Sequence, residues 1–555
     1  MSVLLRFILF AFALSASLHV YSQPAAVASA HPLATDAGME ILKKGGNAFD
    51  AAIAVTATLA VVEPYSSGIG GGGFWLLHVK QDNRDVMIDG RERAPLAASR
   101  NMYLDQGGNV VSGASIDGPL SAGIPGVPAA IEHLALNYGK LPLSVTLEAA
   151  IKHASSGFKT DEHYQSMARF REKALNKSTD AAKIYLQNKK SPVPGTLIRQ
   201  PDLADTLRIL ASKGARGFYQ GELADKLVDS VVRHGGIWSK EDLAAYKVIE
   251  RVPVRGEYRG MKVVSAAPPS SGGVALIQML SMLAGFDFES LSDSEQTHLL
   301  AEVMRRAYRD RAEFLGDADY VKVPVNRLIS QKHVDRLIST IQLDQATPST
   351  ELSSAIVDAG KATDTTHFSI VDNEGNRVAA TLSINYPFGS CFVAEGTGVL
   401  LNDEMDDFSS KPGVPNVYGL VGAEANAIEP GKRMLSSMTP TFLETEDRIA
   451  VLGTPGGSRI ITMVLLATLE FHKGGSAGDM VNRGRFHHQY LPDKIFYEPD
   501  ALTETILKSL FERGHDTETL DSSYGNMHAI VLDRKSMQLD AASDDRGSGS
   551  ARVEH

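Results

Sequence analysis

The sequence contains one cysteine, Cys391, among 555 residues, and this scarcity limits the chemistry available to the protein. A single cysteine excludes intrachain disulfides, CxxC redox chemistry and zinc sites built on cysteine ligands. A Cys–His nucleophile is formally possible, but a small buried thiol is the more common role of a lone cysteine. The 49 glycines and 24 prolines are too few for a fibrous or disordered protein. We therefore expect a globular chain whose core holds without covalent cross-links.

Positive charge is also in short supply. The chain has 55 lysines and arginines against 66 aspartates and glutamates, which gives a formal net charge of −11. A dedicated binder of nucleic acids or anionic membranes needs a net basic surface, so both classes are disfavoured. A local basic site for an acidic small molecule remains compatible with this composition.

Long hydrophobic runs are confined to the N-terminus. Arg6 is followed by an apolar stretch from Phe7 to Val20, which is too short for a confident transmembrane span. This pattern predicts a secretory signal peptide over residues 1–22, with an uncleaved N-terminal anchor as the alternative. Export without disulfides is typical of a bacterial periplasmic or secreted enzyme.

The stretch from Ser66 to Phe74 contains a run of glycines that invites comparison with a phosphate-binding loop. No Lys-Ser or Lys-Thr pair follows it, and the next residues predict a strand. We therefore expect close approach of two backbones beside a pocket. The pattern from residue 125 to 311 is mostly helical. Its last helix, over 295–314, contains four arginines: Arg305, Arg306, Arg309 and Arg311. An anion site is one interpretation of them, but we expect a solvated face in which they interleave with acidic residues.

A β-hairpin is predicted directly after a polar segment. Residues 341–364 are small and polar without apolar periodicity, which predicts a mobile linker. Two alternating runs then flank the turn Asp-Asn-Glu-Gly-Asn, which is a hairpin pattern. Folding the hairpin about the middle of this turn pairs Val371 with Arg377. The same register places Thr365 opposite Ser383.

A linker that runs into a strand beginning with Thr365 is chemically informative. A threonine hydroxyl within a chain is a poor nucleophile, whereas an N-terminal threonine carries its own base, an α-amine with a pKa near 7.7–8.0. The Asp364–Thr365 bond must be cut to create that amine, and the hydroxyl can attack the preceding carbonyl itself. The β-branched side chain has few rotamers, so the hydroxyl is already aimed. Taken alone, however, a Thr-Thr pair at a strand start is usually a matter of β-propensity.

Ordered motifs along the chain resemble the γ-glutamyltransferase family of N-terminal nucleophile hydrolases. In the second part they are Asp364-Thr-Thr-His367, Leu401-Asn-Asp-Glu-Met-Asp-Asp-Phe408, Lys411 to Gly422, Leu435-Ser-Ser-Met438 and Pro455-Gly-Gly-Ser-Arg459. In the first part they are Gly45-Gly-Asn-Ala-Phe-Asp50, the Ser66 to Phe74 glycines, Arg91-Glu-Arg-Ala-Pro95, Pro269-Ser-Ser-Gly-Gly273 and Arg305-Arg-Ala-Tyr308. The tail Ala542-Ser-Asp-Asp-Arg-Gly547 fits as well, so the resemblance covers nearly the whole mature chain.

The resemblance implies an α+β fold, a four-layer αββα sandwich built from two subunits of one precursor. The large subunit would span residues 23–364 and the small subunit 365–555, and the two would stay together as a heterodimer. The implied enzyme transfers γ-glutamyl groups from glutathione and related compounds to water, amino acids or peptides. No cofactor and no metal are expected. The neighbouring His487 and His488 lack metal-ligand spacing and are interpreted as structural or surface residues.

Catalytic roles also follow from the resemblance. Thr365 is the nucleophile, with Thr366 as the alternative by register. Ser383 stands where the family usually has threonine, and its hydroxyl can still hydrogen-bond the amine or hydroxyl of Thr365. Gly456 and Gly457 match the glycines of the oxyanion hole, and a helix N-terminus behind them would favour a negative oxygen.

Recognition of a free γ-glutamyl end requires groups of both charges, because it carries a carboxylate and an ammonium. By resemblance the carboxylate binders are Arg91, Ser436 and Ser437, and arginine offers the two-pronged geometry that a carboxylate fits. The ammonium binders, which must be acceptors, are Asn385, Glu404 and Asp407. Tyr418 on the lid segment 411–422 would contact Asn385. Two departures concern the pocket: Met434 replaces a common proline, and Glu404 replaces a neutral amide of some bacterial members.

Two alternative hypotheses compete with a γ-glutamyltransferase. Within the same fold, the chain could be a cephalosporin or glutaryl acylase or a poly-γ-glutamate hydrolase, although such relatives tend to lack the lid. Outside enzymology, it could be a pseudoenzyme that binds γ-glutamyl ligands without cutting them. Intact Thr365, Gly456 and Gly457 argue against the second reading.

Overall fold

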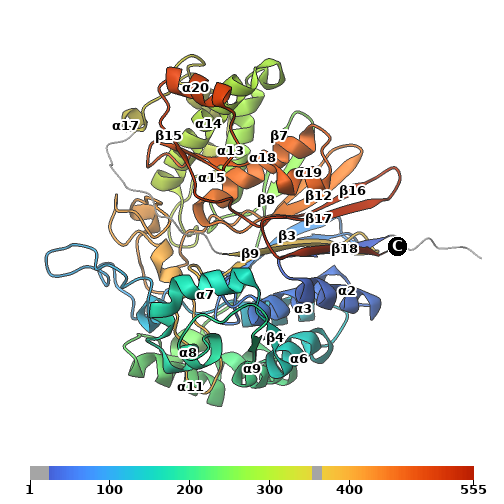
Figure 1. The fold of residues 1–555 in the computed structure, drawn as a ribbon, viewed down its shortest axis with the longest axis vertical. Helices are drawn as coiled ribbons and strands as arrows, with labels where there is room; N and C mark the ends of the chain where they lie inside the picture. The colour runs from blue at the N-terminus through green and yellow to red at the C-terminus, as the bar shows by residue number, and fades with distance from the viewer. Residues whose placement is uncertain (1–23, 353–364, 555) are drawn as a thin grey trace, which may run out of the picture.

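The structure, a computed structural model, describes residues 24–352 and 365–554. Two large β-sheets face each other in the middle of the molecule, and helices cover the outer side of each sheet (Figure 1). This arrangement confirms the predicted four-layer αββα sandwich. The predicted signal peptide, and residues 353–364 of the predicted linker, lie outside the described residues.

The first sheet has seven strands in the order β18-β1-β9-β10-β2-β3-β6. Their bounds are β1 Ala25–Ser29, β2 Gly72–Val79, β3 Arg84–Asp89, β6 Ile249–Arg251, β9 Thr366–Val371, β10 Arg377–Ser383 and β18 Ser550–Glu554. The hairpin of β9 and β10 lies between β1 and β2, with antiparallel pairing on both sides. Strands that follow residue 365 are therefore held by strands from the first eighty residues.

The second sheet has six strands in the order β17-β16-β12-β11-β8-β7. Their bounds are β7 Val254–Tyr258, β8 Met261–Ser265, β11 Thr441–Glu444, β12 Arg448–Gly453, β16 His528–Asp533 and β17 Leu539–Ser543. This sheet, too, mixes strands from before and after residue 365, since β8 pairs with β11. Neither sheet is complete without both parts of the chain.

One apolar core lies between the first sheet and its helices, and a second core extends from between the two sheets to the helices on the second sheet. The layer on the first sheet contains α2 Pro32–Lys43, α3 Ala48–Val62, α4 Val127–Asn137, α6 Glu148–Ser156, α7 Glu162–Leu175, α9 Pro201–Lys213 and α11 Glu222–Arg233. The layer on the second sheet contains α13 Gly272–Ala284, α14 Asp293–Phe314, α16 Gln331–Ile338, α18 Ile460–His472, α19 Ala477–Asn482 and α20 Glu504–Glu512. Every residue of α3 is buried, which is consistent with its mainly apolar sequence.

The hairpin has the predicted register. Val371 pairs with Arg377, and the ladder continues to Thr366 opposite Leu382. One step further along the ladder sets Thr365 against Ser383. Side chains alternate between the faces of a strand, so Phe368 and Ile370 enter the α3 core and Thr366 points to the same side.

The glycine run brings two backbones together, as predicted. A Cβ on Gly70 would collide with the carbonyl oxygen of Leu400, and a Cβ on Gly71 with that of Ser383. Only residues without a side chain allow this approach. The run thereby fixes the chain that follows α3 beside the end of β10, where Ser383 lies.

The prediction of a solvated arginine face on α14 is wrong for three of the four arginines. Arg305, Arg306 and Arg311 are 2%, 1% and 5% exposed, whereas Arg309 is partly exposed and pairs with Glu313. A buried guanidinium requires partners, and these arginines find acidic or hydroxyl groups inside the protein. The helix therefore has a buried polar stripe beside its apolar one.

The linker prediction is also wrong for residues 341–352, which pack against α14. Arg306 donates to the hydroxyl of Thr347 at 3.0 Å, and Arg305 to the hydroxyl of Ser349 at 2.7 Å. Asp493 accepts from the backbone N–H of Ser349 at 2.6 Å, just where α17 (Ser349–Leu352) begins. Buried ionic groups, rather than apolar periodicity, hold this segment in place.

None of the helices that the structure describes combines the length and the apolar character needed to cross a lipid bilayer.

We predict that Gly71→Ala lowers the melting temperature and the soluble yield markedly. The added methyl would meet the Ser383 carbonyl, and overpacking against a backbone costs roughly 1–3 kcal/mol. Thermal unfolding followed by circular dichroism measures the effect. Gly478→Ala is the matched control, because its Cβ would meet nothing closer than 3.6 Å. Equal melting temperatures for the two variants would contradict the close approach.

Candidate active site

A small cavity at the start of β9 brings together the residues expected to act on substrate. It is lined by Arg91, Thr365, Ser383, Asn385, Glu404, Asp407, Tyr418, Leu420, Ser436, Ser437, Met438, Gly457 and Ile460. Gly456 lines a second, larger cavity that also contains Thr365. All predicted site residues except Asp364, which lies outside the described residues, therefore surround Thr365.

Arg91 is the central charge of the small cavity. It follows β3, and its backbone N–H donates to Asp89, which fixes the turn. The guanidinium is 1% exposed and contacts Glu404 through Nη1 and Asp407 through Nη2, both at 2.5 Å. Its Nε donates to the carbonyl of Met434 at 3.3 Å. The predicted carboxylate binder is thus paired with two of the predicted ammonium binders.

Burial opposes ionisation of the acidic groups around Arg91. It raises the pKa of Glu404 to about 7, although the Arg91 charge pulls in the other direction. Burial also raises the pKa of Asp407, and it raises that of the adjacent Glu92 well above its ordinary value. The cavity therefore contains more carboxyl groups than a single guanidinium neutralises.

Ser436 and Ser437 are oriented as donors towards the cavity. The Oγ of Ser436 accepts the N–H of Met438 at 3.1 Å, and the Oγ of Ser437 accepts from Arg311 at 3.1 Å. Each hydroxyl still has its own proton to donate, since the hydroxyl oxygen is already accepting. Two such donors beside a guanidinium suit a carboxylate ligand.

Arg311 is a site residue that sequence reasoning missed. It is buried, bonds Ser271 at 3.0 Å and supports Ser437. A signal was present in the sequence, because Met304, Ala307 and Arg311 recur at helical spacing on one buried face of α14. The many charged residues of α14 favoured a solvated helix face, whereas this spacing favoured burial of Arg311.

Tyr418 closes one side of the small cavity. Its hydroxyl donates to the backbone carbonyl of Asn385 at 2.6 Å, which is the contact expected from the sequence. Its ring packs so closely on Gly457 that a Cβ there would lie 2.7 Å from a ring carbon. The segment around it is tied down, since Asn416 accepts from the N–H of Tyr418 and donates to Asp407.

Gly456 and Gly457 join β12 to α18 through a short 3-10 turn, Gly457–Arg459. Their φ angles of +141° and +55° favour glycine over any residue with a side chain. Tyr308 donates to the carbonyl of Ser458 and holds the turn from the α14 side. Backbone N–H groups at the start of a helix favour a negatively charged oxygen.

Ser383 stabilises the turn after β10. Its Oγ accepts the backbone N–H of Asn385 at 2.7 Å, and Asn385 has a φ of +74°. The Asn385 side chain donates to the carbonyl of Asp403 at 3.1 Å. Ser383 therefore has a structural partner in addition to its place opposite Thr365.

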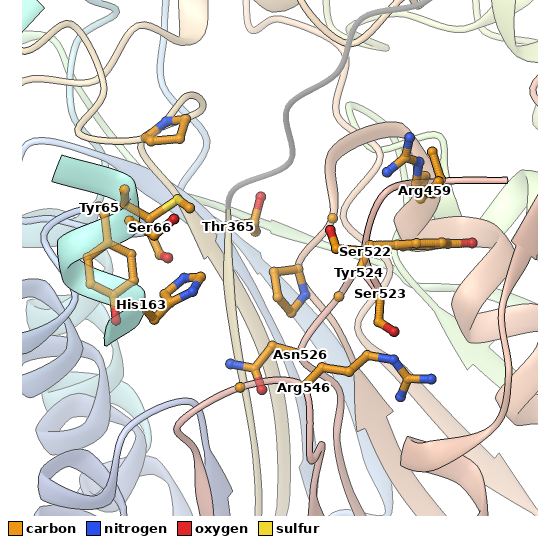
Figure 2. A pocket seen from close by; sticks show the side chains of 18 of the residues that line it. Tyr65, Ser66, His163, Thr365, Arg459, Ser522, Ser523, Tyr524, Asn526 and Arg546 are labelled. Atoms are coloured by element: carbon orange, nitrogen blue, oxygen red, sulfur yellow. The ribbon is translucent and has the colours of Figure 1, made fainter. Parts of the chain in front are cut away.

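The larger cavity also borders Thr365 (Figure 2). Figure 2 shows Thr365 between a wall with Tyr65 and His163 and a wall with Arg459 and Tyr524. The Arg459 guanidinium stacks over the Tyr524 ring at 4.7 Å. Burial lowers the pKa of His163, so this ring is neutral near pH 7. The cavity has a volume of about 520 Å³, polar and apolar groups share its lining, and it borders Thr365 directly.

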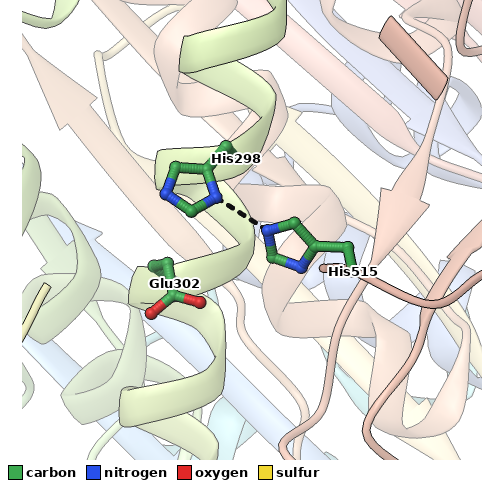
Figure 3. A group of neighbouring side chains, drawn as sticks. All are labelled: His298, Glu302 and His515. Carbon is green, nitrogen blue, oxygen red and sulfur yellow. Dashed lines mark hydrogen bonds between the residues drawn. The ribbon is translucent and has the colours of Figure 1, made fainter. Parts of the chain in front are cut away.

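One group outside these cavities has metal-ligand character: His298, Glu302 and His515 (Figure 3). The Gln342 carbonyl, 2.7 Å from Nε2 of His298, can only accept, so that nitrogen carries the proton. Nδ1 of His298 then accepts from His515 at 2.7 Å. Arg305 lies 3.3 Å from the Glu302 carboxylate and adds a positive charge where a cation would bind. These contacts account for the group as part of the network that holds residues 340–349.

The two histidines read as structural or surface residues are both buried, and so is Cys391. His487 bonds Thr462 and Gln489, and His488 lies 3.2 Å from Asp493. The Cys391 thiol accepts from Arg171 at 3.2 Å, and burial raises its pKa to about 12. A thiol with that pKa is not a nucleophile near neutral pH.

Comparison with known proteins gives matches over nearly the whole chain. The sequence model of the gamma-glutamyltranspeptidase family matches residues 34–553. A curated relative from Pseudomonas sp. (strain A14), named glutathione hydrolase proenzyme, is 44% identical over 491 residues, which cover 87% of this chain and 85% of the relative. A relative of the same name from Escherichia coli (strain K12) is 40% identical over 525 residues, covering 94% and 90%. The solved structure of cephalosporin acylase from Bacillus halodurans aligns with a TM-score of 0.83 at 27% identity and covers 96% of both chains.

We predict that Arg91→Met destabilises the protein more at pH 8 than at pH 5. Burial raises the pKa of Glu404, Asp407 and Glu92 in the folded state, and loss of the guanidinium raises it further. The folded state then binds more protons than the unfolded state, so its stability falls as pH rises above about 4. Loss of one partner of a buried ion pair costs roughly 3–5 kcal/mol. Thermal unfolding at the two pH values measures this.

Arg100→Met is the matched control, because Arg100 pairs with the largely exposed Glu424. Such pairs contribute about 0–1 kcal/mol. A pH-independent loss of stability in Arg91→Met would contradict the charge assignment.

Proposed function

The chain belongs to the gamma-glutamyltranspeptidase family and is an enzyme with hydrolase and transferase activity, and from this premise we propose its substrate, its maturation and the roles of its residues. The enzyme cleaves the γ-glutamyl amide of glutathione and related compounds. It forms a γ-glutamyl ester on Thr365 and passes the group to water or to the amine of an amino acid or peptide.

The observation that carries this proposal is the small cavity, in which Thr365 faces groups of both charges. A free γ-glutamyl end brings a carboxylate and an ammonium together. The carboxylate would pair with Arg91 and the hydroxyls of Ser436 and Ser437. The ammonium would form ion pairs with Glu404 and Asp407, both of which pair with Arg91 in the structure. Binding thus exchanges one set of ion pairs for another without leaving a buried charge unpaired.

The reaction proceeds through an acyl-enzyme. The Oγ1 of Thr365 attacks the γ-carbonyl carbon while its proton passes to the threonine α-amine. The resulting oxyanion is stabilised by the N–H groups of Gly456 and Gly457. Expulsion of the amine, which takes up the proton, leaves the ester. Water or an acceptor amine then attacks the ester, and Thr365 recovers its hydroxyl proton.

Maturation uses the same hydroxyl. Oγ1 of Thr365 attacks the carbonyl carbon of Asp364, the peptide nitrogen leaves as an amine, and water hydrolyses the ester. The large subunit would span residues 23–364 and the small subunit 365–555. The interleaved sheets support a lasting heterodimer, because β9 and β10 lie between β1 and β2. Removal of residues 1–22 and export to the periplasm or beyond, in a bacterial cell, are part of this proposal.

The larger cavity suits the leaving amine and the incoming acceptor. It contains Thr365 and Gly456, so a molecule bound there would meet the ester on the side away from Arg91. Tyr418, on the lid segment, packs against Gly457 and would limit entry of water into the small cavity. The two cavities therefore separate the group that is transferred from the group that is exchanged.

An acylase acting on a glutaryl side chain is the second candidate, favoured by the structural likeness to the Bacillus halodurans cephalosporin acylase. A glutaryl group lacks the ammonium and would leave Glu404 and Asp407 without a cationic ligand group. The higher identity to the two glutathione hydrolase proenzymes also favours γ-glutamyl substrates. A binding protein without turnover is not supported by this family membership.

We predict that the purified protein consists of two chains under denaturing conditions. The smaller chain begins at Thr365, has 191 residues (555 − 364) and a mass of about 20.5 kDa, which is 191/555 of 59.7 kDa. Thr365→Ala leaves one uncut, inactive chain, because the hydroxyl that attacks is gone. Intact-mass spectrometry and an anilide assay measure both effects.

Thr366→Ala is the matched control for the choice of nucleophile. It removes the neighbouring hydroxyl and should still give a small chain beginning at Thr365. Normal turnover in Thr365→Ala, or a first residue other than threonine at position 365, would refute the nucleophile assignment.

We predict that kcat/KM for a γ-glutamyl anilide exceeds that for the glutaryl anilide by at least about 100-fold. The glutaryl compound forfeits its charge-assisted contacts to Glu404 and Asp407, which are worth roughly 1.5–3 kcal/mol each. Asp407→Asn should narrow the ratio, whereas Glu424→Gln on the exposed part of the same loop should leave it unchanged. Equal activity on both anilides would favour the acylase candidate.

A further inference from the structure

Glu63 is a buried carboxyl group beside the nucleophile that the reaction described above does not use. It directly follows α3 and is 3% exposed. Its backbone carbonyl accepts the N–H groups of Ser66 and Ser67, so the start of the glycine run holds it in place. Glu63 lines the larger cavity together with Thr365.

The Glu63 side chain reaches the residue next to the nucleophile. Its Oε2 accepts the hydroxyl of Thr366 at 2.7 Å, and its Oε1 accepts that of Tyr65 at 3.3 Å. Thr366 is the first residue of β9 and points towards α3. Thr365, whose peptide nitrogen would become the amine, directly precedes Thr366 and lines the same cavity.

The charges that surround Glu63 leave it uncompensated. In the parts of the chain that the structure describes, no lysine, arginine or histidine forms an ion pair with it. The charge of Asp161, the residue that caps α7, raises the pKa of Glu63 further. His163 of α7 lines the same cavity, and burial lowers its pKa. The pKa of Glu63 is raised to about 7, chiefly by burial.

The positive groups on the other walls already have partners. Arg459 stacks on Tyr524, and Arg91 pairs with Glu404 and Asp407. Arg546 pairs with Glu498 and Asp544. A new cation at the start of β9 would therefore find in Glu63 a buried carboxylate of the same cavity that lacks a cationic partner among the described residues.

We propose that Glu63 is a positioning residue that receives the ammonium of Thr365 once the chain is cut and thereby sets the proton affinity of that amine. The inference rests on the proposed function, which supplies the cut. Hydrolysis of the Asp364 ester leaves a carboxylate on Asp364 and an amine on Thr365. When this amine takes up a proton, it brings a positive charge to the place where Glu63 lacks one.

The pairing has two consequences of opposite sign. A neighbouring carboxylate stabilises the ammonium and raises the pKa of the amine, while the ammonium lowers the pKa of Glu63. Before the cut, the carboxyl must be ionised without a counter-charge, and this opposes folding as pH rises from about 4.5 to about 7. After the cut, the same carboxylate has an ion-pair partner.

The first test is the pH dependence of kcat/KM for the γ-glutamyl anilide in mature Glu63→Gln. The acidic limb reports the amine of the free enzyme. We expect it to move to lower pH by about one unit, because glutamine removes the charge that favours the ammonium. Glu518→Gln is the matched control: it lines the same cavity, pairs with Lys494 and should leave the limb unchanged. An unshifted limb in Glu63→Gln would overturn the proposal.

The second test uses the uncut chain and does not depend on maturation. In the Thr365→Ala background, Glu63→Gln should change the melting temperature more favourably at pH 8 than at pH 5, since it removes an uncompensated charge. The reverse pH dependence, or none, would mean that Glu63 already has a partner before the cut and would refute the proposal.

Intact mass separates the possible failures. If the Glu63→Gln variant folds but stays uncut, Glu63 acts in the cleavage step. That result would contradict the proposed role of Glu63 in the mature enzyme. A wild-type chain that stays uncut would instead contradict the proposed function itself.

Discussion

The contact on which the site depends is the buried ion pairing of Arg91 with Glu404 and Asp407. These residues are more than three hundred positions apart, and the guanidinium also holds the carbonyl of Met434. A buried arginine without such partners would be too costly to maintain. These contacts therefore fix the segment of Glu404 and Asp407, and that of Met434, to the end of β3. The lid segment is held in turn, because Asp407 accepts a hydrogen bond from Asn416.

The second constraint is the position of the hairpin within the first sheet. Antiparallel pairing on both sides leaves β9 no freedom of register, because a slip by one residue would turn Phe368 and Ile370 out of the α3 core. Successive side chains alternate, so Thr366 faces α3 while Thr365 lies between the two cavities. One rigid strand thus brings Thr365, the proposed nucleophile, to the small cavity and Thr366 to Glu63.

The local sequence pattern predicted the hairpin and its register, because alternating apolar residues and the turn between them lie close together in the chain. The site residues followed from the family resemblance, since pairs such as Arg91 and Glu404 carry no spacing rule that one sequence reveals. Errors arose where tertiary charge pairing overrode local composition. The arginines of α14 and residues 341–352 are polar and yet ordered, because each supplies the partners that the other needs. Glu63 was missed because its significance depends on Thr366, three hundred residues away.

The balance of charge explains why the small cavity suits a zwitterion. Arg91 and Arg311 face Glu92, Glu404 and Asp407, so ionisation of all five groups would leave one excess negative charge. Burial resists that state and raises the pKa of the three acids. An ammonium ligand lets the carboxyl groups ionise, and the freed Arg91 then needs an anion, which the ligand's own carboxylate provides. A carboxylate alone would add to the excess, whereas an ammonium offsets it. The count of charges thus accounts for the ammonium, and the freed Arg91 guanidinium beside Ser436 and Ser437 accounts for the carboxylate. The α-amino acid end of a γ-glutamyl compound carries both groups.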